Sequence, residues 1–333
     1  MSGTPPSHEA SPASPRSIAI TGAAGYIGSR VLDRLLRDRG SVETIVAIDV
    51  RPVSEASRQA GVVYVAADIR VPHLDEVFRE HRVDAVVHLA AVVTPGPEID
   101  DGELHSVEVQ GTENVLEACL ASGVPQIVIV SDTAAYGYHP DNPTPIPESA
   151  PLRGNDEFAE SRHKRMVEEL LARWRQLHPE LRQLVLRCAH VLGPHAHGHG
   201  TERLTRKWLA GVKGVEERFA FAWDEDLATL IVRGLHERRA GIYNVAGDGV
   251  VTAREIAERT GARLLSLSPA LLRRVIGMAW TLGLTKDGPE QLWRVRYRPV
   301  PSTDALRRDF GAVPRLTAHE AFERFWSARR RSA

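Results

Sequence analysis

The feature that most constrains the fold is an alternation of short apolar strands with helices through the first half of the chain. The strand-like runs hold consecutive apolar residues instead of alternating ones, which indicates burial on both faces. We predict strands over 17–21, 43–49, 62–68, 84–91, 125–131 and 181–187, and helices over 26–40, 103–123 and 155–178. Helices between buried strands make right-handed crossovers, so the pattern predicts an α/β fold with a doubly wound parallel sheet.

A glycine triplet stands between the first strand and the first helix. In TGAAGYIGSR, residues Gly22, Gly25 and Gly28 permit a tight turn and a close approach of the backbone to a ligand. The helix that begins at Tyr26 and Ile27 presents free amide groups and the positive end of its dipole, which favour an anion. A purely structural glycine turn is the alternative. The strand–turn–helix context favours a pyrophosphate-binding loop of the Rossmann type.

An acidic residue, Asp49, ends the second strand 21 residues after Gly28. A carboxylate there accepts hydrogen bonds from the ribose hydroxyls of a dinucleotide and repels a 2′-phosphate, so it favours NAD over NADP. Arg51 follows two residues later and is of the type that accommodates a 2′-phosphate, which keeps NADP as the alternative cofactor. An ordinary turn residue at a strand end is the other interpretation of Asp49.

The rhythm of strands and helices breaks after residue 187 into loops rich in Gly, His and Pro. We expect a disordered tail over 1–15, a dinucleotide-binding domain over 16–187, and mainly a smaller substrate-binding lobe over 188–333. The segment of about 222–246 is expected to return to the first domain. The substrate would lie in the crevice between the two.

Composition narrows the choice of partners. A formal net charge of −1 over 333 residues supplies no field for nucleic acid or anionic membranes, and two cysteines cannot build a disulfide framework. The segment 271–284 is amphipathic but too short to span a bilayer, and we expect it to cover a core or a partner. The run 190–199 itself contains four histidines but no acidic or Cys ligand, so no metal site is expected. We therefore predict a cytoplasmic protein with a small-molecule substrate and with neither nucleic acid nor a membrane as partner.

The glycine spacing, together with AADIR after the third strand and HLAA after the fourth, resembles the extended short-chain dehydrogenase/reductases, and more narrowly the NAD-dependent epimerase/dehydratase family. The resemblance continues through LRCAHVLGP, FAWDEDLATLIVRGL, GIYNVAGDG and STDALRRDFG. It implies that the protein binds NAD and acts on a nucleotide sugar or another small hydroxyl or carbonyl compound. Relatives often dimerise through the two long helices, so a homodimer is one implied assembly. The further cofactor contacts that the resemblance implies are Asp68, Ile69, Leu89, Ala90, Ala91, Ala189 and His190.

In that family a Ser or Thr after the fifth strand orients the reacting oxygen. A Tyr-x-x-x-Lys pair on the next helix supplies a proton exchanger and a cation that holds the nicotinamide ribose. The run SDTAAYG places Asp132 at the hydroxyl position, four residues before Tyr136. Ser131 and Thr133 flank it, but neighbouring side chains of an extended strand point to opposite faces, so neither replaces it. Tyr136, at a position where relatives carry a tyrosine near the substrate, is an alternative proton donor.

The tyrosine of the Tyr-x-x-x-Lys pair is missing from this sequence. The run ESRHKRMVE puts Lys164 at the lysine position and Glu160 at the tyrosine position, and none of the six tyrosines precedes a lysine by four residues. One interpretation is a surface ion pair between the two, worth roughly a few tenths of a kcal/mol. The other interpretation places Glu160 at the reactive centre, where burial beside Asp132 would raise the pKa of one acid and Lys164 would oppose that rise.

Two functions are compatible with these replacements. In the first, the chain is an enzyme in which Lys164 binds the cofactor ribose while Glu160 and Asp132 form a non-standard acid/base pair. In the second, the chain binds NAD without redox chemistry and serves as a sensor or interaction partner. A third alternative is that the chain is an ordinary family member that was inactivated by engineering.

Overall fold

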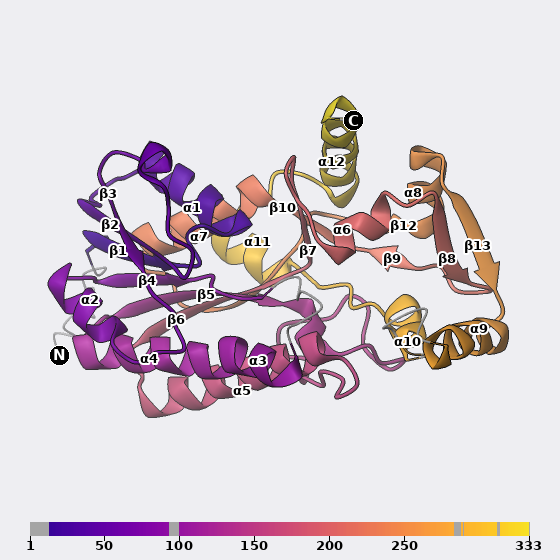
Figure 1. The fold of residues 1–333 in the computed structure, drawn as a ribbon, viewed down its shortest axis with the longest axis horizontal. Coiled ribbons are helices and arrows are strands. Elements are labelled where there is room, and N and C mark those ends of the chain that lie inside the picture. Colours follow the sequence, from indigo (N-terminus) through magenta and orange to yellow (C-terminus); the bar gives the residue numbers. More distant parts are fainter. Residues whose placement is uncertain (1–12, 93–99, 283–287, 289, 312–313, 333) are drawn as a thin grey trace, which may run out of the picture.

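Seven parallel strands form the central sheet of the computed structural model, which describes residues 13–92, 100–282, 288, 290–311 and 314–332 (Figure 1). Their order across the sheet is β3–β2–β1–β4–β5–β6–β11. The strands are β1 (Ser17–Thr21), β2 (Thr44–Asp49), β3 (Val62–Ala66), β4 (Ala85–His88), β5 (Gln126–Asp132), β6 (Arg182–Cys188) and β11 (Gly241–Val245). The doubly wound α/β fold predicted from the sequence is confirmed. Because the order reverses between β1 and β4, the ligand crevice is expected beyond the carboxyl ends of these two strands.

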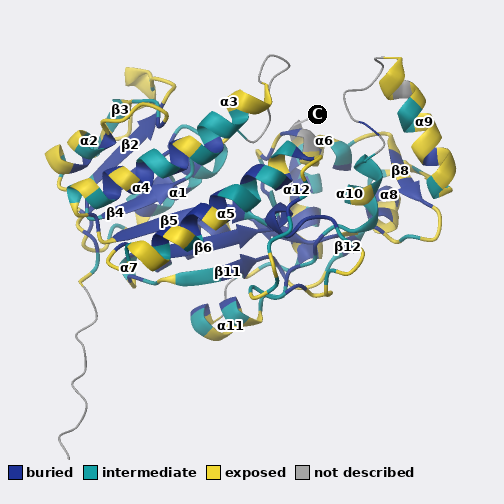
Figure 2. Cartoon of the chain, turned by 90° about the horizontal axis from the view of Figure 1, so that it is seen from below, coloured by how far each residue is buried: buried dark blue, intermediate teal, exposed yellow. Residues whose placement is uncertain are grey.

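Helices cover both faces of the sheet, as two separate apolar cores (Figures 1 and 2). One face carries α1 (Tyr26–Arg37), α7 (Asp224–His236) and α11 (Asp304–Phe310), and the other carries α2 (Leu74–Glu80), α4 (Gly111–Ser122) and α5 (Ala159–Leu177). All five residues of β1 are buried, the apolar Ile18–Ile20 together with Ser17 and Thr21 at its ends, as expected of a strand covered on both sides.

The helix predicted over 103–123 consists of three consecutive segments. It begins with α3 (Asp101–His105), widens into the π-helical turn η2 (Ser106–Gln110) and continues as α4. Asp100 caps the start by accepting a 2.8 Å hydrogen bond from the Glu103 amide, and Gly123 ends α4 in the left-handed conformation. The π-helical turn matters for the site, because Glu108 lies within it and is buried.

In its described residues, a second lobe contains three two-stranded sheets and several helices, and its core contains Phe219, Phe221, Phe322 and Phe325. The sheets pair β7 (His190–Leu192) with β10 (Phe221–Trp223), β9 (Arg218–Phe219) with β12 (Val251–Thr252), and β8 (Trp208–Val212) with β13 (Arg263–Leu267). The helices are α6 (His199–Leu204), α8 (Ala253–Thr260), α9 (Pro269–Thr281), α10 (Gln291–Arg296) and α12 (Ala318–Ser332).

The chain passes between the two units more than once. After building β7 to β10 of the lobe, it returns with α7 and β11, and β11 pairs with β6 at the edge of the main sheet. At the other end of the chain, the expected tail 1–15 falls mostly outside the described residues. Its last residues are held: the Ser14 hydroxyl donates to the His236 carbonyl at 2.7 Å, and the Arg238 guanidinium donates to the Ala13 carbonyl at 2.9 Å.

Helices that could cross a lipid bilayer, judged by length and apolarity, are absent from the described part of the chain.

Candidate active site

The glycine turn between β1 and α1 packs directly against the segment after β4. Gly22 has a φ of +71°, and a Cβ atom there would lie 2.6 Å from the Ala90 amide nitrogen. At Gly28 a Cβ would lie 2.1 Å from the Gly22 carbonyl oxygen, so two of the three glycines are fixed by close backbone approach. Gly25 is the N-cap of α1, with no side-chain cap and no acidic residue in the first turn. The start of α1 therefore keeps amide groups that suit an anion.

Asp49 lies at the carboxyl end of β2, beside this turn. One carboxylate oxygen accepts a 3.0 Å hydrogen bond from the Ala24 amide, and the other accepts from the Arg51 amide and guanidinium at 3.0 and 3.2 Å. Asp49 therefore stabilises the glycine turn. It also forms an ion pair with Arg51, the residue that kept NADP as the alternative cofactor in the sequence analysis. A pocket next to these groups is lined by Ala23, Ala24, Ala47, Asp49, Arg51, Pro52, Val53, Arg58, Tyr64, Val65 and Ala66.

These features fit a dinucleotide. The cradle at Gly22 and Gly28 admits no Cβ, the start of α1 has no side-chain cap, and Asp49 keeps a carboxylate at the edge of the adjacent pocket. Of the first-turn residues, Tyr26 is committed elsewhere through its side chain, because its hydroxyl donates to Asp224 at 2.6 Å. Tyr26 could therefore serve an anion only through its backbone.

Among the other residues predicted to contact the cofactor, some interact with their surroundings through the backbone and others through the side chain. Leu89 and Ala90 present their backbone to Gly22, and Ala91 next to them is exposed. The Ile69 side chain packs into the core beneath α4, and its carbonyl accepts from the Asn114 amide group at 2.9 Å. Asp68 forms an ion pair with Arg70 at 2.6 Å, which holds the pKa of the Asp68 carboxyl below its usual range.

Ala189 and His190 directly follow β6. The Ala189 amide donates to the Val245 carbonyl at 2.9 Å, which ties it to β11. Burial lowers the pKa of His190 to about 4, so its imidazole is neutral near neutral pH. Its Nε2 atom is buried without a partner among the residues that the structure describes.

Lys164 on α5 and Glu108 in the π-helical turn form a close pair. The Lys164 Nζ atom donates to Glu108 Oε2 at 2.6 Å, and Glu108 Oε1 accepts from the Val92 amide at 2.9 Å. Burial alone would lower the pKa of Lys164, but the charge and hydrogen bond of Glu108 outweigh it and raise the pKa above its ordinary value. Lys164 is therefore a fixed, protonated cation.

Asp132 ends β5 and caps the short helix η3 (Thr133–Tyr136) by accepting a 2.6 Å hydrogen bond from the Ala134 amide. Burial and the nearby charge of Glu160 raise the pKa of Asp132 to about 6, against opposing contributions from the Ala134 amide, Lys164 and Arg294. This carboxyl group is thus close to half-protonated just below neutral pH.

Glu160, at the first turn of α5, pairs with Arg294 of α10, from the other lobe. The Arg294 guanidinium also lies over two aromatic rings, 5.4 Å from the centroid of Tyr138 and 5.2 Å from that of Phe158. Glu160 is thereby held between α5 and α10, and Lys164 is held by a different carboxylate.

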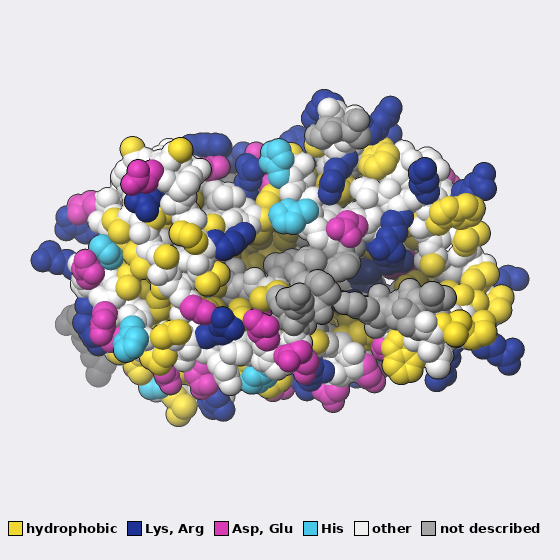
Figure 3. All heavy atoms as spheres, in the orientation of Figure 1, with side chains coloured by type: hydrophobic (Ala, Val, Ile, Leu, Met, Phe, Trp, Pro, Cys, Tyr) yellow, Lys and Arg dark blue, Asp and Glu magenta, His cyan; other side chains and the backbone are white. Residues whose placement is uncertain are grey.

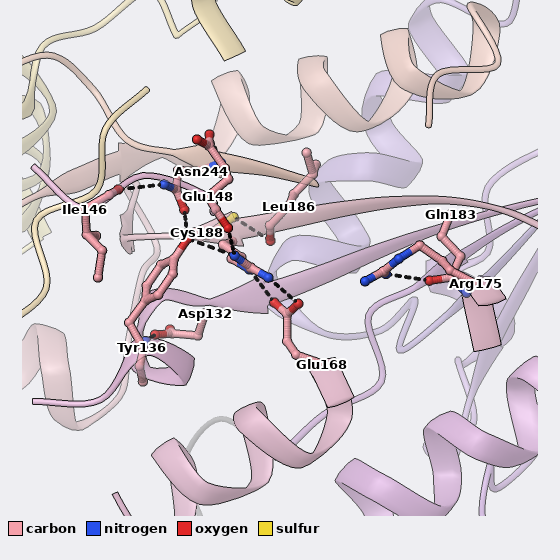
Figure 4. A network of polar contacts seen from close by, with 12 residues as sticks. Asp132, Tyr136, Ile146, Glu148, Glu168, Arg175, Gln183, Leu186, Cys188 and Asn244 are labelled. Carbon is pink, nitrogen blue, oxygen red and sulfur yellow. Dashed lines mark hydrogen bonds and ion pairs between the residues drawn. The ribbon is translucent and has the colours of Figure 1, made fainter. Parts of the chain in front are cut away.

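Tyr136 belongs to a buried network (Figure 4). Its side chain is fully buried, and its hydroxyl donates to the Asn244 side chain at 2.8 Å and accepts from the Arg187 guanidinium at 2.9 Å. Arg187 is in turn bound at 2.8 and 2.9 Å by both oxygens of Glu168. A hydroxyl with these partners joins β6, β11 and α5, and proton transfer to a substrate would require breaking the network.

Three residues at the site were missed by sequence reasoning: Glu108, Arg294 and His88. Burial and the charge of Lys164 lower the pKa of His88 to about 4, and its ring bridges the Thr21 and Thr112 hydroxyls at 2.7 and 3.0 Å. Glu108 could have been found from the sequence, because it is a charged residue on the side of the predicted helix that faces the sheet. No local pattern signalled Arg294, because its partner lies 134 residues away.

Comparison with known proteins agrees with this geometry. The sequence model of the NAD dependent epimerase/dehydratase family matches residues 18–246. An uncharacterised protein of Mycobacterium tuberculosis is 24% identical over 96% of this chain and 85% of its own length. A UDP-glucose 4-epimerase of Azospirillum brasilense is 36% identical over 56% of this chain and 52% of its own.

Two solved structures share the fold. The UDP-glucose 4-epimerase of Thermus thermophilus, in complex with NAD, is similar with a TM-score of 0.70 and 24% identity, over 94% of this chain and 99% of that one. The dTDP-glucose 4,6-dehydratase of Bacillus anthracis, also in complex with NAD, gives a TM-score of 0.72 and 18% identity, over 95% and 96% of the two chains. The glycine cradle, Asp49 and the matched family sequence agree with one another: the chain belongs to the NAD-dependent epimerase/dehydratase family.

Proposed function

We propose that the protein is an NAD-dependent enzyme that acts on a hydroxyl or carbonyl carbon of a nucleotide sugar, with Asp132 as the proton-exchanging group. The observation that carries the proposal is the position of Asp132, at the end of β5 and within the electric field of Glu160 and Lys164. The substrate class rests on the relatives, which include UDP-glucose 4-epimerases and a dTDP-glucose 4,6-dehydratase.

NAD, when bound, supplies the acceptor and donor of hydride. Asp132 is the acid best suited to the accompanying proton, because a pKa of about 6 leaves both protonation states populated near neutral pH. Its ionised form would accept the proton of a substrate hydroxyl, and its acid form would return a proton to a carbonyl oxygen. The Ala134 amide fixes the orientation of the carboxyl group during both steps.

The other charged groups have supporting roles in this proposal. Lys164, kept protonated by Glu108, would hold the nicotinamide ribose and stabilise negative charge at the reacting oxygen. Glu160 would act as a positioning residue, because its charge keeps the pKa of Asp132 high while Arg294 holds it between α5 and α10.

The test is turnover of UDP-glucose and dTDP-glucose, followed by analysis of the sugar products and of reduced nicotinamide. Asp132→Asn is expected to lower kcat by about 10²-fold to 10⁴-fold, the usual contribution of a general acid/base, while the affinity for NAD stays within about two-fold. Glu160→Gln should shift the pH profile of kcat/KM to lower pH and leave substantial turnover at the optimum. Full activity in Asp132→Asn would refute the role of Asp132.

A second candidate, an NAD-binding protein without redox chemistry, is favoured by one observation. Each of two carboxylates around the centre is already matched to a cation, Glu108 to Lys164 and Glu160 to Arg294. This function predicts saturable binding of NAD without products from any of the sugars. Turnover that appears only in the double variant Asp132→Ser/Glu160→Tyr would support it, since that variant restores the family pattern.

A further inference from the structure

Helix α9 carries two apolar stripes, and only one of them faces the protein. Leu272 is buried, as expected for a helix that covers a core. The other stripe comprises Leu271, Val275, Met278 and Leu282, spaced by four, three and four residues, which places them on one side of a helix. Their side chains are 48%, 41%, 60% and 72% exposed. The sequence predicts that this segment covers a core or a partner: the buried Leu272 fits the first, and the exposed stripe is free for the second.

The charge around this stripe has one sign. Residues 263–282 contain Arg263, Arg273 and Arg274 and no Asp or Glu, in a chain whose net charge is −1. Arg273 and Arg274 are exposed, and the described part of the chain offers neither of them an ion-pair partner. Figure 3 shows hydrophobic side chains at this end of the molecule with Lys and Arg at their margins.

Three tryptophans are exposed at the same end of the molecule. Trp280 lies on the side of α9 opposite the stripe, Trp293 on the adjoining α10 and Trp208 on β8, and they are 56%, 44% and 50% exposed. The Arg263 guanidinium stacks on Trp208, 5.1 Å from the ring centroid. Indole rings that combine an apolar body with a polar edge are enriched where a protein meets the headgroup region of a bilayer.

We propose that the α9 face, defined as Leu271, Val275, Met278, Leu282 and the flanking Arg274, docks on the surface of an anionic lipid bilayer. The apolar stripe would enter the boundary between headgroups and acyl chains, and Arg274 at its flank would pair with anionic headgroups. The contact is peripheral and requires no spanning helix. It departs from the expectation of no membrane partner, because that expectation used the net charge of the whole chain and this face has a local charge.

A second copy of the chain fits the face less well. A two-fold dimer brings the same patch of both subunits together, so Arg274 would face its own copy. The segment 263–282 holds no carboxylate to neutralise it. A bilayer rich in anionic lipid supplies both the apolar layer and the negative charge that the α9 face requires. The proposal does not rest on the reaction proposed above.

The test is co-sedimentation of the full chain with vesicles of phosphatidylcholine alone or of phosphatidylcholine with phosphatidylglycerol. Binding is expected only to the anionic vesicles and should weaken as salt rises. The variant Val275→Ser/Met278→Ser should lower the partition coefficient by about ten-fold or more, since it removes two exposed apolar side chains. Arg274→Glu should lower it by at least about five-fold. The matched controls are Leu177→Ser on α5 and Arg308→Glu on α11, which change exposed residues on the other unit.

Light scattering on the same variants separates the alternatives. A monomer that binds anionic vesicles, with loss of binding confined to the α9 variants, supports the proposal. Absence of binding to anionic vesicles overturns it. A dimer that Val275→Ser/Met278→Ser dissociates, without vesicle binding, overturns it as well and assigns the face to a second copy. Equal loss of binding in the Leu177→Ser and Arg308→Glu controls would also refute the specific role of α9.

Discussion

Lys164 donates a 2.6 Å hydrogen bond to Glu108, a residue 56 positions earlier that lies in the π-helical turn between α3 and α4. The pair joins α5 to the π-helical turn before α4, on one face of the sheet, at the point where the nicotinamide end of the cofactor is expected. It leaves Glu160, one helical turn before Lys164, to Arg294 of the other lobe. Lys164 was identified from the Tyr-x-x-x-Lys pattern, but the residue that fixes its position, Glu108, lies outside that pattern.

Replacing Glu108 by Gln tests this relationship. The amide keeps an oxygen for the Val92 backbone but removes the charge that opposes the effect of burial, so the pKa of Lys164 should fall. Affinity for NAD, titrated from about pH 7 to pH 10, should decline at least about one pH unit earlier than in the unmodified protein. Glu113→Gln, on the outer side of α4, is the control. Identical pH curves for Glu108→Gln and the unmodified protein would exclude a role of Lys164 charge in cofactor binding.

Asp132 makes stability depend on pH. An aspartate titrates near 3.9 in an unfolded chain, and the folded protein raises the pKa of Asp132 to about 6. Between these values the folded state binds more protons, so the stabilisation present below about pH 4 is lost as pH rises through about 6.

Asp132→Asn should therefore raise the free energy of unfolding relative to the unmodified protein at neutral pH, and hardly change it at about pH 4. Asn keeps the cap on the Ala134 amide, and partial exposure of the side chain limits the gain to about 1 to 2 kcal/mol. Urea unfolding at several pH values measures the difference. A gain that is the same at every pH would show that the titration of Asp132 is not its cause.

Cofactor choice should depend on Asp49. In Asp49→Asn the repulsion of a 2′-phosphate is lost and Arg51 is released from its ion pair, so the ratio of NAD to NADP affinity is expected to fall by about ten-fold or more. Equilibrium binding of the two cofactors measures this ratio. Asp68→Asn, which removes an acidic group paired with its own arginine, should leave it unchanged. An unaltered preference in Asp49→Asn would remove the basis for assigning NAD selectivity to this carboxylate.

Tyr136 should prove structural. Removing its hydroxyl in Tyr136→Phe leaves the Asn244 oxygen and one Arg187 N–H without that partner in a fully buried site, at a cost of about 1 to 3 kcal/mol in the free energy of unfolding. The kcat at a temperature where the variant is folded should change by less than about two-fold. Tyr297→Phe, outside this network, is the control. A large loss of kcat without loss of stability would instead support Tyr136 as the proton donor.

The sheet and the glycine turn could be predicted from the sequence because each depends on local patterns. The apolar run of β1 and the triplet Gly22, Gly25 and Gly28 determine a strand, a turn and a helix within about twenty residues. Asp49 was found in the same way, from its position at a strand end.

The pairs that fix the site could not be predicted in this way. Glu108 reaches Lys164 only because the helix widens into a π turn, a feature without a strong sequence pattern. Arg294 reaches Glu160 only through the packing of the second lobe on the first. The expected surface pair of Glu160 with Lys164 was plausible by spacing, but spacing within one helix carries no information about partners on other elements.

The return of the chain to the main sheet has a consequence for synthesis and for cutting the protein. β11 completes the sheet beside β6, yet it emerges from the ribosome after β7 to β10 of the second lobe. A nascent chain that ends near residue 187 would present β6 as an open edge, with unpaired backbone groups ready to recruit another strand. Expression of 16–187 alone should therefore yield aggregates, and a soluble fragment would have to extend at least to Val245.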